Sequence, residues 1–264
     1  MNEQSLTFLL KAKSIQTLFK VFEVELKEIC LVGGCVRDAL LGNISLDIDI
    51  AANLKPNEII QILEKNGLLY EDYAYKYGSV TTFVEGQKFQ ITSLREDINQ
   101  KGRHTSIILT DDWKKDAARR DFTINAIYLF PNGELKDFFN GKEDLRNSKL
   151  RFIKKIEDSI QQDFLRIFRY YRFLGLFENP QSIKEYDETL VRYFENSLKH
   201  LSNDIIRQEI LKMFKMPFPV NCFFYKKNIV IKKNWIDLVK KHFIKTSYDI
   251  GLNKCLNKID LLVN

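Results

Sequence analysis

Two aspartates separated by one residue, Asp47 and Asp49, are the first side chains in the sequence that suggest catalysis. They lie in SLDIDIA, residues 45–51, where polar and apolar residues alternate as in a strand. On a strand both carboxylates point to the same side, so they can share one or two Mg²⁺ ions through oxygen ligands. Two ions held in this way serve phosphoryl and nucleotidyl transfer. The exposed face of an edge strand is the alternative interpretation.

A Gly-Gly turn comes shortly before the acidic pair. In LVGGCVRDALLG, residues 31–42, a strand ends at Gly33 and Gly34 and a helix begins at once. Glycines let a backbone approach a ligand closely, and the start of a helix offers free N–H groups and a positive dipole end. Arg37 adds a fixed positive charge for phosphate oxygens. A plain tight turn is the alternative, but the turn, the arginine and the acidic pair fall within 17 residues. Their proximity favours a site for a triphosphate with Mg²⁺.

A second block, AARRDFTINAIYL, occupies residues 117–129. Arg119 and Arg120 stand beside Asp121, so we expect one arginine to pair with Asp121 while the other reaches a ligand. Asn125 is a candidate for a hydrogen bond to a ribose or to the backbone. A purely structural ion pair is the alternative.

A third block, QQDFLRIFRYYRFLGLF, occupies residues 161–177 and is predicted to form a helix. On a helix Asp163 and Arg166 are three residues apart and share a face. Their acceptor and donors match the base edges of cytosine and adenine, which pair an exocyclic amine with a ring acceptor. Arg169 and Arg172 continue the polar series, although Arg172 lies half a turn from Asp163. The alternative is a surface ion pair that contributes roughly a few tenths of a kcal/mol.

The elements that must position these residues follow from the hydrophobic pattern. The expected elements are a helix leading into a strand at 29–32, a helix at 35–42, a strand at 45–51, a helix at 53–67, a hairpin at 77–94 and a strand at 107–110. After about residue 113 the pattern is helical apart from a strand-like stretch at 127–130, and residues 155–216 are predicted as successive helices. These elements predict an α+β fold in which a small mixed sheet with helices precedes a helical extension.

The composition restricts the class of protein. No apolar run approaches the roughly 20 residues that span a bilayer, and the start lacks the basic and apolar regions of a secretory signal. We therefore predict a cytoplasmic protein without a membrane partner. The four Cys and three His are scattered, which argues against a zinc site, so any metal is expected to be a hard cation held by carboxylates.

The positive charge is concentrated at the C-terminal end. The whole chain of 264 residues has a formal net charge of +6. Residues 217–264 contain nine Lys, no Arg and three Asp, and nine minus three accounts for the whole excess. Lysines interleaved with aromatic residues can bind a polyanion because contacts to phosphates release counterions. A solvated, lysine-rich helix surface is the alternative.

The three blocks, in this order and at these distances, resemble the class II tRNA nucleotidyltransferase and poly(A) polymerase family. The family's GGxVRD…LLG…DxDIA signature matches residues 33–51, its RRDFTxNA motif matches 119–126, and its EDxLRxxRxxRF helix matches 162–173. The segments 102–104 and 111–123 look most like alphaproteobacterial members. The similarity covers about residues 28–215 and implies a polymerase-β-like nucleotidyltransferase head followed by an all-helical neck.

The resemblance also implies domains and roles. The head would span residues 1–140 and the helical neck would span residues 141–216. Residues 217–264 would form a short basic C-terminal element that contacts tRNA. The activity would be template-independent addition of CMP and AMP to the 3′ end of tRNA, from CTP and ATP, with Mg²⁺ and release of pyrophosphate. The implied metal ligands are Asp47 and Asp49, and the implied nucleotide-binding residues are Gly34, Arg37, Arg120, Asp163, Arg166, Arg169 and Arg172. Residues 95–112 would be the flexible loop associated with the switch from C to A addition.

The chain departs from the family pattern at several positions. Gln162 stands where the family has Glu, Lys154 and Lys155 replace a usual Gly-Asp pair, and Ser159 replaces a usual Arg. Most members also continue further into helical domains, so the C-terminal part looks shortened. A partial enzyme adding only CC or only A, a poly(A) polymerase, and a slow RNA-binding protein that keeps the head as a scaffold remain as alternatives. Asp47, Asp49 and Arg120 together favour an enzyme.

Overall fold

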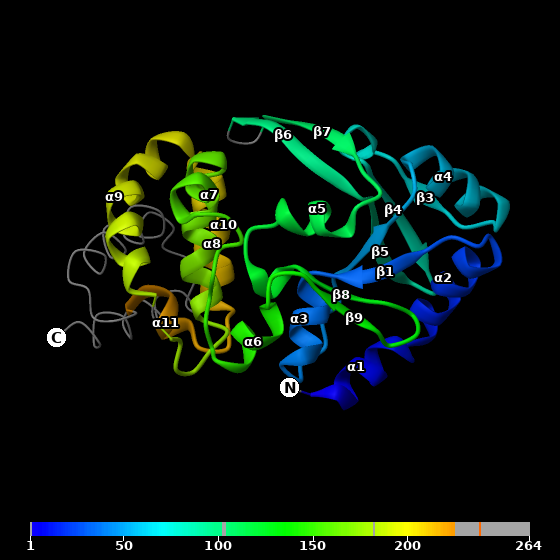
Figure 1. Cartoon of the computed structure of the whole chain (residues 1–264), viewed down its shortest axis with the longest axis horizontal. Coiled ribbons are helices and arrows are strands. Elements are labelled where there is room, and N and C mark those ends of the chain that lie inside the picture. The colour runs from blue at the N-terminus through cyan, green and yellow to red at the C-terminus, as the bar shows by residue number, and fades with distance from the viewer. Residues whose placement is uncertain (1, 102–103, 182, 225–237, 239–264) are drawn as a thin grey trace, which may run out of the picture. The chain divides into compact units, whose positions relative to one another are not determined.

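The computed structural model describes residues 2–101, 104–181, 183–224 and 238 (Figure 1). The chain divides into two compact units. Unit 1 comprises residues 1–166 and 181–186, and unit 2 comprises residues 167–180 and 187–264. Within the described part of the chain, no helix has the length and apolar character needed to cross a membrane. The basic segment predicted at 217–264 lies outside the described residues except for 217–224 and Leu238.

Unit 1 is built on a mixed seven-stranded sheet with the order β3-β4-β5-β2-β1-β8-β9. Only the β2–β5 pair is parallel, and the other pairs are antiparallel. The strands are β1 Ile29–Val32, β2 Ile48–Ala52, β3 Tyr70–Glu71, β4 Ser79–Val84, β5 Gln87–Ser93, β8 Ile127–Leu129 and β9 Leu135–Asp137. The predicted strands at 29–32 and 45–51 and the predicted hairpin are confirmed, whereas the short β3 and β9 were not predicted.

Helices flank this sheet in unit 1. They are α1 Glu3–Leu10, α2 Lys13–Val24, α3 Gly34–Leu40, α4 Pro56–Lys65, α5 Trp113–Ala118, α6 Gly141–Arg146 and α7 Ile156–Gln162, with short 3₁₀ turns η1 Tyr75–Tyr77 and η2 Thr123–Asn125. The N-terminal region forms two helices rather than one, because Ala12 leaves the helical conformation. The amphipathic α2 buries its apolar side, formed by Ile15, Leu18, Phe19 and Phe22.

The region 95–112 contains more strand than its sequence predicted. Arg95–Lys101 forms β6 and His104–Leu109 forms β7, and the two pair as a separate antiparallel hairpin. The single strand predicted at 107–110 is therefore only half of this element. The partner strand REDINQK is rich in polar residues, so neither its composition nor its hydrophobic pattern indicates a strand.

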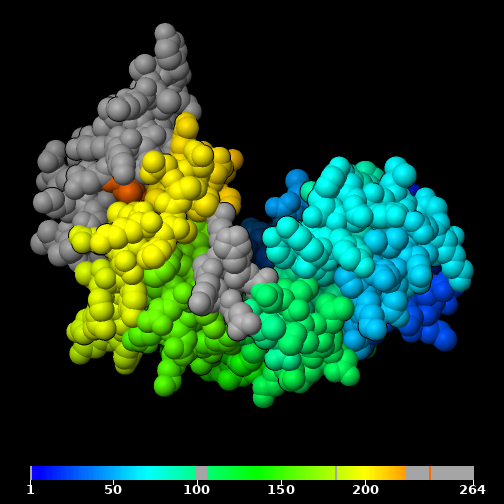
Figure 2. All heavy atoms as spheres, turned by 90° about the horizontal axis from the view of Figure 1, so that it is seen from above, coloured from blue at the N-terminus to red at the C-terminus, as the bar shows by residue number. Residues whose placement is uncertain are grey.

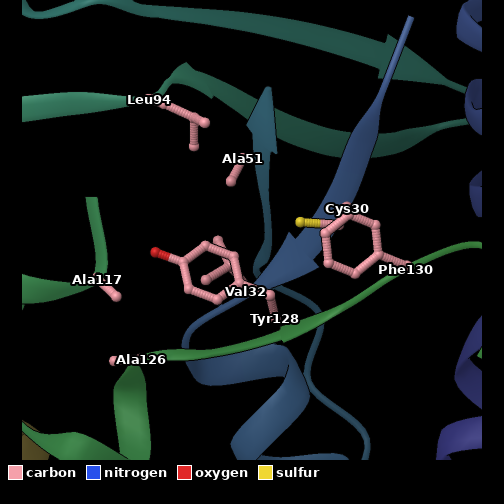
Figure 3. Close-up of a cluster of buried hydrophobic side chains, with 8 residues drawn as sticks. All are labelled: Cys30, Val32, Ala51, Leu94, Ala117, Ala126, Tyr128 and Phe130. Atoms are coloured by element: carbon pink, nitrogen blue, oxygen red, sulfur yellow. The ribbon is translucent and has the colours of Figure 1, made fainter. Parts of the chain in front are cut away.

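A buried cluster joins α5 to the central strands (Figure 3). Its members are Cys30, Val32, Ala51, Leu94, Ala117, Ala126, Tyr128 and Phe130. Small alanines from α5 and from the segment before β8 leave room for the ring of Tyr128 between the elements. The Tyr128 hydroxyl reaches out of this apolar environment and donates to Oδ2 of Asp116 at 2.7 Å. The cluster thereby fixes the position of a buried carboxylate.

Unit 2 consists of helices. They are α8 Leu165–Leu174, α9 Lys184–His200, α10 Asn203–Phe214 and α11 Pro219–Phe224, with the first residues of α8 and α9 belonging to unit 1. Phe168 stacks on Phe194 with ring centroids 5.7 Å apart, and Ile206, Ile210 and Met213 of α10 are buried. The helical surface of this unit is coloured green to orange in Figure 2. The predicted run of helices through residue 216 is confirmed, and together with the mixed sheet it gives the predicted α+β fold.

Candidate active site

The position of the side chain that Gly33 lacks lies between two opposite charges. It follows directly after Val32, the residue of β1 that pairs with Asp49 of β2, and its φ of +79° lies in a region that favours glycine. A Cβ at Gly33 would lie 3.5 Å from Nη1 of Arg120 and 3.6 Å from Oδ2 of Asp49. Any side chain here would therefore fill the space between the carboxylate and the guanidinium.

The acidic pair has the alternation expected from its sequence. Ile48 and Ile50 are buried, Asp49 between them is half-exposed, and Asp47 is exposed just before the first residue of β2. Carboxylate oxygens suit a hard divalent cation. Among the described residues, no group of three or more His, Cys, Asp and Glu side chains could hold a metal. Asp49 lies near Gly33 and Asp47 stands two residues earlier, so a divalent ion held by these two carboxylates would need its remaining ligands from a substrate or water.

Arg37 is buried and bonded within unit 1. Its Nε donates to Oδ1 of Asp38 at 2.8 Å, and its Nη1 donates to Oδ1 of Asn125 at 2.7 Å. Asn125 in turn donates to Oδ1 of Asp121 at 3.1 Å. This chain of contacts links α3 to η2, so Arg37 holds the Gly33–Gly34 turn in place. Its predicted contact with a nucleotide is not tested by these contacts.

The two arginines of the second block pair with a different carboxylate from the one expected. Arg119 Nε lies 2.8 Å from Oδ1 of Asp116, and Arg120 Nη2 lies 3.2 Å from Oδ2. Asp116 also accepts from the Arg95 backbone at 3.3 Å. The expected pairing with Asp121 is therefore wrong, because α5 places Asp116 one turn before the arginines, whereas Asp121 bonds Asn125 and its neighbouring backbone.

The ionisable groups around Asp116 shift one another's pKa values. Burial favours the neutral form of Asp116, but the guanidinium groups of Arg120 and Arg119 and the Tyr128 hydroxyl outweigh it and lower the Asp116 pKa to about 2. Burial works against the Arg120 charge, yet Tyr128 and Asp116 raise the pKa of Arg120 above its usual value. The buried Nε of Arg120 has no hydrogen-bond partner among the described residues. Arg120 therefore provides a fixed positive charge near Asp49, with Nη1 directed at the Gly33 position.

The third block is interrupted rather than continuous. α7 ends at Gln162 and α8 begins at Leu165, so Asp163 lies between two helices with φ of −153°. Its Oδ1 accepts from the Leu165 backbone at 2.9 Å, which makes Asp163 a cap for the start of α8. The expectation that Asp163 and Arg166 share the face of one helix is wrong. The two residues are still joined, since the Arg166 backbone donates to the Asp163 carbonyl at 3.0 Å.

Arg166 connects the second and third blocks. It is only 5% exposed, and its Nη2 donates to the Arg119 carbonyl at 3.2 Å. Its Nη1 donates to Oε1 of Gln162 at 3.2 Å and lies 3.4 Å from the Ser159 carbonyl. Arg166 is thus bonded to Arg119, the neighbour in sequence of Arg120, whose guanidinium lies near Asp49. All of these groups belong to unit 1.

The last two predicted site residues belong to unit 2. Arg172 Nη1 lies 2.9 Å from Oε2 of the buried Glu209 in α10. The Arg169 guanidinium lies over the ring of Phe173, 5.3 Å from its centroid. These contacts anchor α8 within its own unit, and the predicted role of both arginines in nucleotide binding remains a prediction.

Sequence reasoning missed Asp116, which is 1% exposed and organises the arginines. A signal was present: in DAARR the aspartate stands three and four residues before the arginines, the spacing of neighbours on a helix. Glu209 was missed too, and its pairing with Arg172, 37 residues earlier in the sequence, leaves no local signal.

Comparisons with known proteins agree with this geometry. Residues 29–151 match the poly A polymerase head domain. The mitochondrial CCA tRNA nucleotidyltransferase 1 of Danio rerio is 37% identical over 219 residues, which are 79% of this chain and 51% of the relative. The CCA-adding enzyme of Enterococcus faecalis is 34% identical over 188 residues, covering 70% of this chain and 45% of the relative. The chain thus spans about half the length of the curated relatives it matches.

A solved structure shows the same fold. The Thermotoga maritima CCA-adding enzyme, in complex with tRNA-CCA, aligns with a TM-score of 0.66 and 27% identity, covering 95% of this chain and 57% of that one. The mixed sheet with its following helices corresponds to the head and neck of such enzymes. Residues 29–151 therefore match a head domain of the poly A polymerase type, and the chain is similar in sequence and fold to CCA-adding enzymes over about half of their length.

Proposed function

We propose that this chain adds CMP, AMP or both to the 3′ end of tRNA without a nucleic-acid template. The terminal 3′-hydroxyl would attack the α-phosphate of CTP or ATP, and pyrophosphate would leave. The observation that carries this proposal is the space beside Gly33, which lies between the Asp49 carboxylate and the Arg120 guanidinium. Nucleotidyl transfer needs a metal-binding carboxylate and a phosphate-binding cation close to each other.

The divalent metal of this family is proposed to be Mg²⁺, held by Asp47 and Asp49. When bound, the ion would activate the attacking hydroxyl and neutralise charge on the triphosphate. Arg120 would bind phosphate oxygens through Nη1, the guanidinium nitrogen at the Gly33 position. The Gly34 backbone would approach the nucleotide at the start of α3, where Arg37 supports the turn. The protein's part is therefore mainly positioning and fixed charge.

Base recognition is proposed for Asp163 and Arg166, with Arg169 and Arg172 completing the nucleotide pocket. The cap geometry supports the role of Asp163, because its bond to the Leu165 backbone fixes the carboxylate. Hydrogen bonds to Gln162, Ser159 and Arg119 hold the Arg166 guanidinium in place. A fixed acceptor beside a fixed donor is what recognition of a base edge requires.

The proposed partner is the 3′ end of tRNA, in line with the tRNA complex of the Thermotoga relative. We further propose a head at 1–140, a neck at 141–216 and a tRNA-contacting element at 217–264, acting in the cytoplasm. Relatives named as mitochondrial belong to the same family, so the compartment needs its own test by cell fractionation.

The direct test is an incorporation assay. The protein is incubated with tRNA ending before CCA, ending in C or ending in CC, together with labelled CTP or ATP and Mg²⁺, and the product ends are sequenced. Stepwise CCA addition supports the proposal, whereas products ending in CC alone or A alone identify a partial enzyme. Long A tails identify a poly(A) polymerase. Tight tRNA binding without incorporation contradicts an enzymatic function.

Deleting residues 217–264 is expected to weaken tRNA binding while CTP binding to unit 1 persists. The segment holds the whole +6 excess, so its loss should also flatten the decrease of tRNA affinity with increasing salt. Binding is measured by filter retention between low and moderate salt. A matched variant keeps the full length but changes all nine lysines of this segment to Gln. If that variant binds tRNA as the wild type does at low salt, the lysines are only a solvated surface.

Asp163→Asn is expected to relax the rejection of UTP. Asn caps a helix about as well as Asp, so α8 should stay intact. The amide adds donors where the carboxylate only accepts, and it can therefore face the uracil carbonyl. Relief of one mismatched buried group corresponds to about 10-fold in the CTP to UTP preference. Asp163→Ala loses both the cap and the acceptor, and the exposed Asp204→Asn serves as control. An unchanged preference in both Asp163 variants would remove this carboxylate from base selection.

A further inference from the structure

Two positive side chains converge on one neutral oxygen beside the base-reading arginine. Lys154 Nζ lies 3.4 Å from Oε1 of Gln162, and Arg166 Nη1 lies 3.2 Å from the same atom. Lys154 is half-buried in the segment before α7, and α7 packs against β6 within unit 1. An amide carries no charge, so Gln162 orients both cations without neutralising either of them.

Lys154 is partly buried and lies close to Arg166. Partial burial, followed by the nearby Arg166, lowers the pKa of Lys154, while Asp97 and Asp158 act in the opposite direction. An ammonium group has three N–H donors, of which Gln162 accepts one. No other hydrogen bond joins Lys154 to the described part of the chain. Lys154 therefore holds unused donors next to the guanidinium assigned to base recognition.

Cytosine and adenine differ in what they offer to a second donor. Both bases have an exocyclic amine beside a ring nitrogen acceptor, which suits one acceptor and one donor on the protein. Cytosine has a further acceptor, the O2 carbonyl, next to that ring nitrogen. Adenine has a C–H at the corresponding place and can accept nothing there. A second donor beside Arg166 is thus satisfied by cytosine and left without a partner by adenine.

We infer that Lys154 is a specificity-determining residue that donates to O2 of cytosine beside Arg166 and so favours CTP over ATP. The inference rests on the proposed nucleotidyltransferase function and deepens it at the same site. Gln162 has a positioning role in this arrangement, because its oxygen holds Lys154 and Arg166 side by side. A site that hydrogen-bonds a particular group of the substrate rejects an analogue without that group. This rejection is stronger than the discrimination that an apolar pocket achieves.

Lys154→Met tests the inference, since Met has a similar length but no donor. We expect CTP incorporation on tRNA ending before CCA to lose about 10-fold in kcat/KM. ATP incorporation on tRNA ending in CC should stay within roughly twofold. Lys155→Met, which alters the exposed neighbouring lysine, should change neither value. Thermal unfolding of both variants checks that the fold is kept.

A nucleotide analogue gives an atom-specific control. In 2-thio-CTP the O2 acceptor is replaced by sulfur, a weaker acceptor, so the wild type should prefer CTP and Lys154→Met should barely distinguish the two. Equal losses for CTP and ATP in Lys154→Met, or an undiminished preference for CTP over 2-thio-CTP, would overturn the inference. Calorimetric binding of CTP and ATP to the wild type and Lys154→Met measures the same preference without any transfer. An inactive wild type that still shows this Lys154-dependent preference would refute the reaction but support the inference.

Discussion

Asp49→Asn is expected to abolish CMP incorporation by the intact protein. The amide has the shape of the carboxylate but no charge, so it would bind the divalent ion weakly. We expect the rate to fall by more than about 100-fold, the scale on which single preorganised charges act on a transition state. The fold should survive because the backbone of residue 49 keeps its pairing with Val32 and Gln90. Rapid-quench assays with labelled CTP and circular dichroism measure the two effects.

The comparison variant for this experiment is Asp72→Asn. Asp72 is also a carboxylate of unit 1, but it is exposed and lies outside the candidate site. The Asp72→Asn protein should incorporate CTP at the wild-type rate. An Asp49→Asn protein that does the same would refute the assignment of the two aspartates to the metal.

Asp116→Asn should cause the largest loss of stability. The change leaves Arg119 and Arg120 without their shared counter-charge in a buried environment. Removing one partner of a buried ion pair typically destabilises a protein by about 3–5 kcal/mol. Urea unfolding gives the free energy of unfolding, and the exposed neighbour Asp111→Asn is the matched control. A loss no larger than that of the control would show that the pairs contribute little.

The same carboxylate predicts how stability depends on pH. The Asp116 pKa is lowered in the fold from its usual 3.8 to about 2, so the folded state favours the charged form. Its contribution, about 2 kcal/mol, is therefore complete above about pH 4 and is lost as the pH falls towards 2. Asp116→Asn should flatten the acid limb of the stability profile. If the stability of this variant still falls with decreasing pH as steeply as that of the wild type, other carboxylates cause the dependence.

Local patterns in the sequence predicted the acidic pair and the strands that hold it. The alternation around Ile48, Asp49 and Ile50 has a period of two residues, and the structure confirms it because the pattern depends only on neighbours. The Gly-Gly turn and α3 were predicted for the same reason. Residues that act through local geometry can be found from spacing alone.

Other features depend on distant contacts and could not be predicted. The apolar pattern runs on through residues 160–168, so it hides the break at Asp163 that the cap to Leu165 creates. Asp116 is buried because Tyr128 and the start of β6 pack over α5, and these contacts join segments far apart in the sequence. Strand β9 has three residues and exists only through its pairing with β8.

The charged neighbours of Gly33 affect which substitutions this position can accept. Gly33 and Gly86 both have positive φ angles, but a Cβ at Gly86 would meet nothing within 4 Å. At Gly86 only backbone strain opposes substitution, and residues such as Asn tolerate that conformation. At Gly33 any other residue would also place its Cβ in contact with Asp49 and Arg120. Substitution is therefore opposed by the backbone conformation alone at the hairpin tip, whereas at Gly33 it would also occupy the position between Asp49 and Arg120.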